Sequence, residues 1–353
     1  MEKRWVFKPE ADQQDIEHLE GVLKIHPILA GLLAQRGVKT YDQAKMFFRP
    51  SLDSLHDPFK MKDMNRAIER IEKAIQHQQR ILIYGDYDVD GTTSVALVYS
   101  FLKKFYSHLD YYIPDRYEEG YGISYKGIEY AHEHNVSLII ALDCGIKAAR
   151  KIEYANGRNI DFIICDHHTP EKLLPDAVAV LDPKRSDCNY PFKDLSGCGV
   201  GFKMLQAFSQ TNNIDFGELY PFLDLVAVSI ASDIVPIIGE NRTMAHFGLK
   251  QLNKDPGTGL KAIINMSGLG DKDHQIETED VVFRIGPRIN AAGRIESGRS
   301  AVDLLITDDS QKARQKAQKV NSCNDTRKNI DRNITQDALK MIAYEPGFRE
   351  KKS

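Results

Sequence analysis

The segment GDYDVDGTTS carries three aspartates at alternate positions, Asp86, Asp88 and Asp90. Carboxylates this close repel one another, and a divalent metal ion is the simplest group that offsets their charge. The segment opens like a calcium loop of the EF-hand type, but Leu97 stands where that loop needs its bidentate glutamate. A capped turn is the alternative, because Asp is common at turns and helix caps. Taken alone, the segment leaves a metal site and a capped turn equally open.

Other segments offer further metal ligands. Asp166, His167 and His168 stand in a row after an apolar run, and two adjacent histidines among several carboxylates favour metal ligation. Mixed carboxylate and imidazole ligands suit Mn²⁺, Mg²⁺ or Fe²⁺ better than the thiolate-rich sites of structural zinc. Asp143 lies in ALDCGI, where small neighbours leave room for an ion. Asp233 follows an apolar run, where a lone buried carboxylate is costly without a cation, although a helix cap is again the alternative.

Five short apolar runs must position these side chains: RILIYGD, LDYYIPD, SLIIALD, DFIICD and AVAVLD. They alternate with helical patterns, which predicts an α/β fold with a parallel β-sheet and helices on both faces. Ligands of open α/β sheets bind outside the carboxyl ends of the strands. We therefore expect one edge of the sheet to gather the aspartates that end the runs, namely Asp86, Asp115, Asp143, Asp166 and Asp182.

The flanking segments look helical, and the pattern divides the chain into four parts. We expect an N-terminal helical cap at 1–77, a metal-binding α/β domain at 78–235, a helical segment with an Arg-rich loop at 236–308, and a connecting helix at 309–353. The last helix, from about residue 310 to 341, is polar all round, which suits a connector between domains or a packed surface helix.

The chain of 353 residues has a formal net charge of −3, so contact with nucleic acid requires a local basic surface. The segment RIGPRINAAGRIESGR offers one, because arginine forks bind phosphate and glycines let backbone amides approach a strand closely. A surface loop that pairs with acids of the protein itself is the alternative. The segment holds Arg284, Arg288, Arg294 and Arg299 against one acid, Glu296, and its glycines are Gly286, Gly293 and Gly298.

Cellular location and redox state follow from what the sequence lacks. No apolar run reaches the roughly 20 residues that span a bilayer, and the first residues lack the apolar core of a signal peptide. The five cysteines are irregularly spaced without a CxxC pair, which indicates buried, reduced thiols. We therefore expect a cytoplasmic protein without membrane contact.

The motifs GDYDVDG, ALDCG, DHH and ASDIVP, in this order, resemble those of the DHH phosphoesterase superfamily. IPDRYEEGYG, SGCGVGFK and GPRINAAGR resemble the RecJ branch, the single-strand-specific 5′ to 3′ DNA exonucleases. The likeness covers residues 20 to 345 approximately.

The resemblance implies roles for particular residues. Asp86 would be a ligand or a supporting carboxylate, Asp166 would orient the neighbouring imidazole, and His168 would face the scissile phosphate. Other members of the superfamily have a histidine where this chain has Tyr84, and Asp86 is the expected replacement. Two Mn²⁺ or Mg²⁺ ions, bridged by Asp143, would be held by Asp88, Asp90, Asp143, His167 and Asp233.

The resemblance also implies DNA contacts. Arg116 would meet the terminal phosphate, and Tyr121 or Tyr117 would stack on a base. The Arg-rich segment would add Arg288, Asn290, Arg294 and Arg299. Lys203 is a weaker phosphate candidate, because neither GxGxxG nor P-loop spacing surrounds it.

The activity implied is hydrolysis of single-stranded DNA to mononucleotides by water activated between two metal ions, in DNA repair and recombination. Single-stranded DNA, a single-strand-binding protein and a helicase are the implied partners. Members of this branch continue into a domain with a GGGH-like motif and an oligonucleotide-binding fold. Since neither occurs in this sequence, we expect a truncated chain with weak DNA binding and little or no processive digestion.

Two other kinds of function remain open. The same metal centre serves phosphodiesterases of short oligonucleotides or cyclic dinucleotides and manganese pyrophosphatases, which would not need the Arg-rich segment. A non-catalytic DNA-binding scaffold is the other alternative, but a scaffold gains nothing from mutually repelling acids.

Overall fold

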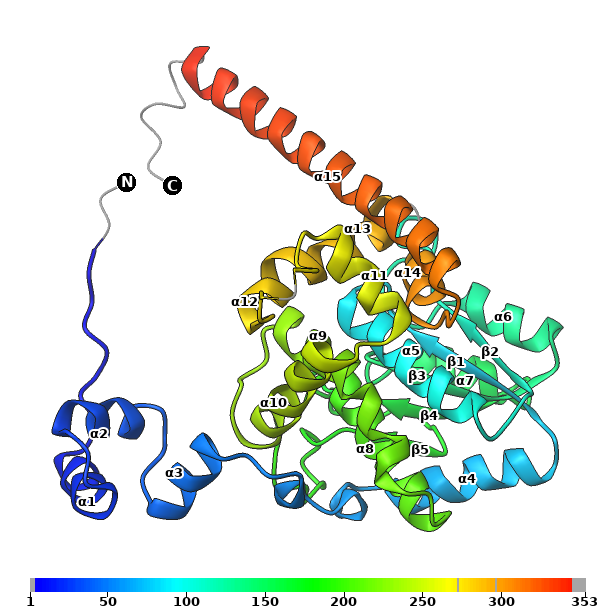
Figure 1. The fold of residues 1–353 in the computed structure, drawn as a ribbon. Helices are drawn as coiled ribbons and strands as arrows, with labels where there is room; N and C mark the ends of the chain where they lie inside the picture. The colour runs from blue at the N-terminus through cyan, green and yellow to red at the C-terminus, as the bar shows by residue number, and fades with distance from the viewer. Residues whose placement is uncertain (1–3, 272, 296, 345–353) are drawn as a thin grey trace.

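The computed structural model describes residues 4–344, except 272 and 296. Its centre is one parallel sheet with the strand order β2-β1-β3-β4-β5 (Figure 1). The five strands correspond to the five apolar runs, so the predicted α/β fold is confirmed. Their bounds are β1 Arg80–Gly85, β2 Leu109–Tyr112, β3 Val136–Leu142, β4 Asp161–Cys165 and β5 Ala179–Leu181.

The sheet is apolar on both faces because helices cover both. Along β1, Ile81 and Ile83 join the core on one side, whereas Leu82 and Tyr84 join the core on the other. The first side is covered by α4 (Met64–Gln76), α5 (Val89–Lys103) and α8 (Gly197–Thr211). The second is covered by α6 (Tyr125–Glu133) and α7 (Ala149–Asn156). Residues buried on both faces explain why the strands read as continuous apolar runs.

The strand order places two acid-bearing strand ends side by side. β1 and β3 are neighbours, while the chain reaches β2 on one side and β4 on the other. Such a reversal in strand order is a topological switch point, where open α/β sheets bind ligands. Asp86 follows β1 directly and Asp143 follows β3 directly, so both carboxylates start from this point.

The Arg-rich segment is helical, and the predicted loop is wrong. A π-helical turn, Val281–Ile285, leads into α13 (Gly286–Ile295), and α14 (Gly298–Leu305) follows. Val281, Ile285, Ile289 and Ala292 are buried and recur at helical spacing, which the many Gly and Arg residues concealed.

Glycines of this segment serve packing within the protein. A Cβ at Gly293 would lie 2.4 Å from the backbone oxygen of Tyr87, and one at Gly298 would lie 3.0 Å from the Tyr87 Cβ. Helices α13 and α14 therefore rest directly on the turn that carries Asp86 and Asp88.

Further helices complete the first side of the sheet. Helices α9 (Leu223–Ser232) and α10 (Gly239–Lys254) pack against each other, and α9 also packs on α5. Helix α11 (Thr258–Met266) packs on α14, and the short α12 spans Thr278–Asp280.

Asp224 gives this helical layer a pH-dependent stability. Its buried carboxylate accepts hydrogen bonds from the backbone N–H groups of Gly257 (2.8 Å) and Leu225 (2.6 Å), but burial raises its pKa from 3.8 to about 7. An acid with a raised folded-state pKa binds protons more readily when folded, so its stabilising contribution falls as pH rises from about 4 to 7. Between pH 5 and 8, the free energy of unfolding of the wild type should fall by up to about 3 kcal/mol relative to that of Asp224→Asn. Urea unfolding of both proteins across this range measures it, and a pH-independent difference would contradict it.

The N-terminal helices have a core of their own. Helices α1 (Gln13–Leu23), α2 (Pro27–Ala34) and α3 (Tyr41–Phe48) bury one apolar cluster, and the 3₁₀ turns Leu52–Ser54 and Pro58–Lys60 lead from it toward α4 (Figure 1). Helix α4, which the sequence analysis assigned to the cap, instead packs against α8 and β5 in the main core. The predicted domain boundaries otherwise stay predictions.

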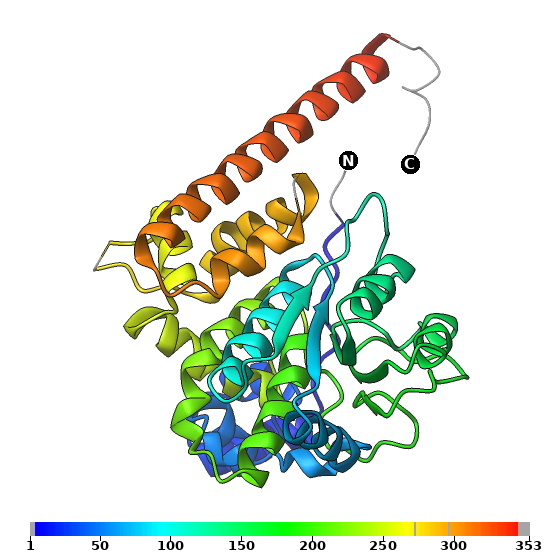
Figure 2. The ribbon, with the colours of Figure 1, turned by 90° about the vertical axis from the view of Figure 1, so that its right-hand side faces the viewer.

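Helix α15 (Ser310–Tyr344) projects from the body of the molecule (Figures 1 and 2). Ala313, Ala317 and Val320 are buried against α11, α13 and α14, while its outer half is exposed. Residues 345–353 of the predicted connecting helix lie outside the described residues. In the part of the chain that the structure describes, no helix combines the length and apolar character needed to cross a bilayer.

Candidate metal centre and nucleic-acid interface

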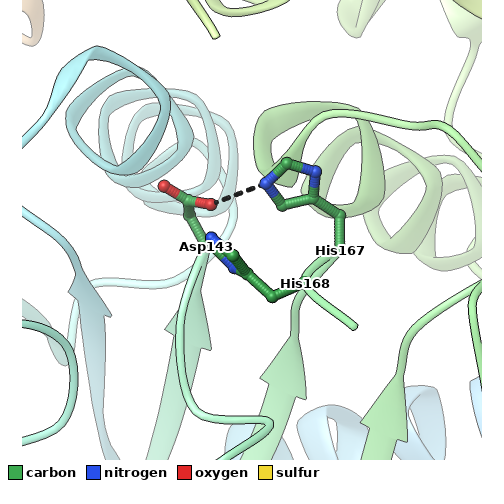
Figure 3. A group of neighbouring side chains, drawn as sticks. All are labelled: Asp143, His167 and His168. Carbon is green, nitrogen blue, oxygen red and sulfur yellow. Dashed lines mark ion pairs between the residues drawn. The ribbon is translucent and has the colours of Figure 1, made fainter. Parts of the chain in front are cut away.

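The imidazole of His167 is surrounded by carboxylates from three other elements. Its Nε2 lies 3.2 Å from Asp143 Oδ1, 3.6 Å from Asp233 Oδ2 and 3.7 Å from Asp90 Oδ2. Figure 3 shows the Asp143 carboxylate and the His167 ring facing each other from neighbouring strand ends. The structure thus brings together side chains that are up to 143 positions apart in the sequence.

Asp143 is a buried carboxylate directly after β3. It has a left-handed backbone (φ 58°), and its N–H donates to the Cys165 carbonyl oxygen at 2.9 Å. Its side chain is 2% exposed, and Oδ1 accepts no hydrogen bond. Burial, followed by repulsion from Asp90 and Asp88, raises its pKa well above the ordinary value. A Cβ at Gly197 would lie 2.6 Å from the Asp143 Cβ, so α8 approaches this carboxylate as closely as a glycine permits.

The three aspartates after β1 have different partners. Asp88 is the N-cap of α5, where its Oδ1 accepts the N–H of Gly91 at 3.0 Å. Asp86 accepts the N–H of Gly122 at 3.3 Å, while its Oδ2 is buried without a partner. Burial first and Asp88 second raise the pKa of Asp86 to about 7. Burial first and Asp90 second also raise the pKa of Asp88.

Asp90 is held at the beginning of α8. Its Oδ2 accepts the N–H of Gly197 at 2.7 Å, and its Oδ1 accepts the N–H of Cys198 at 2.8 Å and the Ser229 hydroxyl at 2.7 Å. Asp90 therefore accepts N–H groups at the beginning of α8 and also lies near His167. The segment can thus be a capped turn and part of a metal site at the same time.

His168 belongs to a chain of polar contacts beside the carboxylates. Its Nδ1 lies 2.7 Å from Asp166 Oδ1, and its Nε2 lies 3.3 Å from the Tyr121 hydroxyl. Asp166 is buried and also accepts the backbone N–H groups of His167, His168 and Ile146. The hydrogen bond to Asp166 raises the pKa of His168. Burial raises the pKa of Asp166, but its bond to His168 and further hydrogen bonds outweigh burial and leave the pKa lowered.

Asp233 completes the group at the C-terminal end of α9. Its side chain is 29% exposed, and burial, Asp90 and Asp88 raise its pKa to about 7. A carboxylate at a helix C-terminus meets the negative end of the helix dipole, which is unfavourable without a cation. The next residue, Ile234, has φ 59°, a strained conformation for a β-branched side chain.

The donor atoms fit a divalent cation. Asp86 Oδ2, Asp143 Oδ1 and His167 Nδ1 are buried without hydrogen-bond partners, and several carboxylates have raised pKa values. Two groups bring one potential ligand atom per residue within 4.8 Å of one another: Asp143 with His167 and His168, and Asp90 with His167 and Asp233. Carboxylate and imidazole donors suit Mn²⁺ or Mg²⁺. The predicted ligand Asp88 and the supporting Asp86 lie in the same turn but outside these two groups.

Tyr84 occupies the position where other superfamily members have histidine. It is fully buried, stacks on Tyr112, and its hydroxyl donates to the Gly122 carbonyl oxygen at 3.0 Å and accepts the Ser124 N–H at 3.1 Å. Tyr84 thereby fixes the segment whose Gly122 N–H contacts Asp86.

The predicted DNA contacts divide into two sets. Arg116, Tyr121 and Arg294 lie around the acidic turn: the Arg116 guanidinium is 5.1 Å from the Tyr87 ring centre, the Tyr121 ring is 6.2 Å from Tyr87, and the Arg294 carbonyl oxygen accepts the Tyr117 hydroxyl. The other three have partners in the protein.

Arg288 Nε donates to Asn321 Oδ1 at 2.9 Å, Asn290 Oδ1 accepts the Val89 N–H at 3.1 Å, and Arg299 lies 5.0 Å from the Tyr111 ring centre. These contacts favour the alternative of internal pairing for part of the Arg-rich segment. Lys203 Nζ lies 3.0 Å from Glu240 Oε1, and both side chains are buried. An ion pair within the core therefore accounts for Lys203.

Sequence reasoning missed the residues that hold the centre in place: Tyr87, Ser196, Gly197 and Ser229. Ser196 caps α8 by accepting the Gly199 N–H, and its hydroxyl bonds to Ser229. The signal was present in SGCGVG, because Ser before a glycine-rich apolar run marks a helix start that comes close to a neighbour.

Part of the chain matches a known protein family, and curated relatives match most of its length. The DHH family, N-terminal domain, matches residues 80–230. The single-stranded-DNA-specific exonuclease RecJ of Bacillus subtilis (strain 168) is 40% identical over 340 residues, which are 96% of this chain and 42% of the relative. The RecJ of Escherichia coli (strain K12) is 32% identical over 90% of this chain and 56% of the relative.

The fold has a counterpart among solved structures. The crystal structure of exonuclease RecJ bound to manganese is 29% identical, with a TM-score of 0.74, and the match covers 82% of this chain and 72% of that chain. The chain spans about half the length of the curated relatives it matches.

Proposed function

We propose that the chain, whose residues 80–230 match the DHH family, N-terminal domain, carries the catalytic centre of a metal-dependent exonuclease. Its substrate is single-stranded DNA, which it hydrolyses from the 5′ end to mononucleotides. The observation that carries the proposal is the arrangement of Asp143, Asp233 and Asp90 around His167, with unpartnered buried donor atoms. The relatives named single-stranded-DNA-specific exonucleases support the substrate.

The side chains have separable tasks in this mechanism. Asp88, Asp90, Asp143, His167 and Asp233 would hold two Mn²⁺ or Mg²⁺ ions, with Asp86 beside them. When bound, such ions lower the pKa of water and offset the charge of the phosphate. Asp166 fixes the His168 ring through Nδ1 and favours its protonated form, because the hydrogen bond to Asp166 raises the pKa of His168. The protonated Nε2 then donates to a non-bridging phosphate oxygen as negative charge increases. Tyr121, now 3.3 Å from that nitrogen, is the partner that the phosphate replaces.

Arg116 and Arg294 provide the proposed positive surface beside the acids. Both are exposed, and the Tyr87 ring lies against Arg116. Arg116, which lies beyond the end of β2, would bind the terminal phosphate of the DNA through two N–H groups of its guanidinium. Tyr121, with half of its surface exposed, is placed to stack on a base.

Cellular role and partners rest on the family likeness alone. With single-stranded DNA as substrate, we propose a role in DNA repair and recombination in the cytoplasm. A single-strand-binding protein and a helicase are the proposed protein partners.

The test is metal-dependent release of mononucleotides from a single-stranded 20-mer labelled at either end. With Mn²⁺, the 5′ label should appear first as a mononucleotide, whereas EDTA should abolish release and a blunt duplex should be resistant. Early release of the 3′ label would contradict the polarity, and equal cleavage of duplex would contradict the strand specificity.

A second candidate, a phosphodiesterase of short oligonucleotides, is favoured by one observation. Arg288 and Arg299 have partners within the protein, which shortens the basic surface available to a long strand. Rates for strands of 2, 5, 10 and 20 nucleotides separate the two functions. Rates that rise with length support the exonuclease, and rates highest for two nucleotides support the second candidate.

A further inference from the structure

A cavity of about 640 Å³ opens beside the metal centre, on the side of the sheet covered by α6 and α7. Its walls come from residues 121–125, 144–151 and 166–173, three segments that each follow a strand. Asp166 and His168 line it, so it shares a wall with the candidate centre. No role in the mechanism above uses the remainder of this cavity.

The interior of the cavity has an apolar lining. Its lining includes Cys144, Ile146 and Ile123, each at most 2% exposed. At the opening, the Tyr125 and Leu173 side chains are 49% and 75% exposed. Small-molecule sites are concave and mainly apolar, with a few polar groups, and have volumes of roughly 300–1,000 Å³. A nucleobase and its sugar fit this size and character.

The opening also carries positive charge. Lys147 and Arg150 are exposed, and no ion pair within the described residues engages either of them. Glu171 is the exposed acid among the lining residues, so cations outnumber it at the rim. Lys151, by contrast, donates to the Ile123 carbonyl oxygen and serves the wall itself. Unpaired cations next to an apolar cavity match the phosphate of a nucleotide whose base lies inside.

A chain of side-chain contacts joins Arg116 to the cavity through Tyr121, which lines it. Arg116 contacts the Tyr87 ring, Tyr87 contacts Tyr121, and Tyr121 contacts His168, which lines the cavity. A strand whose terminal phosphate meets Arg116 and whose scissile phosphate meets His168 therefore reaches the cavity with its next nucleotide.

We propose that this cavity, here called the nucleotide pocket, binds the nucleotide on the 3′ side of the scissile phosphate. Its base lies on the apolar floor, and its following phosphate meets Lys147 and Arg150. The proposal rests on the proposed exonuclease function and its polarity, and it adds a subsite that recognises the second nucleotide of the strand.

The test measures binding without metal, so it does not depend on hydrolysis. In EDTA, saturation-transfer NMR titrations compare three ligands: a 5′-phosphorylated dinucleotide with a 3′-phosphate, the same molecule with an abasic second position, and the 5′-mononucleotide. The dinucleotide should bind at least about fivefold more tightly than the other two, because base stacking and burial contribute about 1 kcal/mol or more. A mononucleotide that binds as tightly as the dinucleotide would assign the pocket to the released product and overturn the proposal.

Two variants locate the binding, and one serves as control. Lys147→Glu combined with Arg150→Glu should weaken dinucleotide binding about tenfold, and Ala148→Trp, which fills the pocket, should remove the preference for a base at the second position. Lys45→Glu combined with Arg49→Glu makes the same charge change at exposed residues of α3 and its C-terminal end, outside the pocket, and should alter affinity less than twofold. Wild-type affinity in the double variant would overturn the proposal. Pocket-dependent binding by a chain that hydrolyses nothing would instead count against the exonuclease function alone.

Discussion

Asp143→Asn should abolish metal-dependent hydrolysis and, at the same time, make the metal-free protein more stable. The amide has the shape of the carboxylate and tolerates the left-handed backbone at this position. It lacks the charge that holds a cation between two strand ends. We expect activity to fall by roughly 100- to 1,000-fold or more, because a charge aimed at the reacting group is lost.

The gain in stability has the same origin as the loss of activity. Asp143 is buried, has an oxygen without a hydrogen-bond partner, and faces repulsion from Asp90 and Asp88. Removing such an uncompensated charge should raise the free energy of unfolding by about 1–3 kcal/mol. Since the folded-state pKa of Asp143 is raised, the advantage of the variant should grow as pH rises above about 4.

Urea unfolding in EDTA measures the gain in stability, and nucleotide release measures the loss of activity. Mn²⁺ titration calorimetry measures the expected weakening of metal binding. Asp187→Asn is the matched control, because Asp187 is half-exposed and paired with Arg185, which lowers its pKa. That variant should keep its activity and lose a little stability. Wild-type activity in Asp143→Asn would reject the role assigned to Asp143, and a less stable apo variant would reject the account of repulsion.

Gly91→Ala should disrupt both the fold around the centre and the activity. A Cβ at Gly91 would lie 2.4 Å from the Asp86 carbonyl oxygen and 2.6 Å from the Asp86 nitrogen. Because both are backbone atoms, β1 and α5 must move apart, and Asp86 and Asp88 move with them. Overpacking of this kind costs about 1–3 kcal/mol, and displacing catalytic groups by about 1 Å costs roughly 100-fold in rate.

Gly21→Ala provides the comparison, because Gly21 is an exposed position inside α1 with no atom within 4 Å of the added Cβ. It should stabilise the protein by about 0.5–1 kcal/mol without changing activity. Thermal unfolding of both variants measures the change in stability, and initial rates of nucleotide release measure the change in activity. Wild-type rates and melting temperature in Gly91→Ala would show that the turn accommodates a side chain.

The sheet was predictable from sequence, because strands buried on both faces appear as unbroken apolar runs. The acids at the ends of β1, β3 and β4 were predictable for the same reason, since parallel strands end at one edge. The contacts of Asp90 were not, because Gly197 and Ser229 lie 107 and 139 positions away. Periodicity identified α4 as a helix, but it carries no information about which core the helix joins.

The Arg-rich segment shows a different limit. Glycine is ambiguous in a sequence, since it marks either a flexible connection or a close approach between elements. Gly293 and Gly298 mark a close approach, because an added Cβ at either glycine would come close to Tyr87. The DNA contacts predicted for Arg288 and Arg299 stay predictions, and their contacts with Asn321 and Tyr111 could be found only from the folded chain.

The packing of α13 gives the protruding α15 a mechanical connection to the acidic turn. Arg288 links α13 to Asn321 of α15, Gly293 of α13 abuts the Tyr87 carbonyl, and Asn290 accepts the N–H of Val89. The contact at the α15 end joins two half-buried side chains, whereas the contacts at the acidic turn involve backbone atoms of Tyr87 and Val89. If the outer end of α15 were tilted, we would expect the stretch between Asp86 and Asp90 to shift through these contacts, and the spacing of its carboxylates to change.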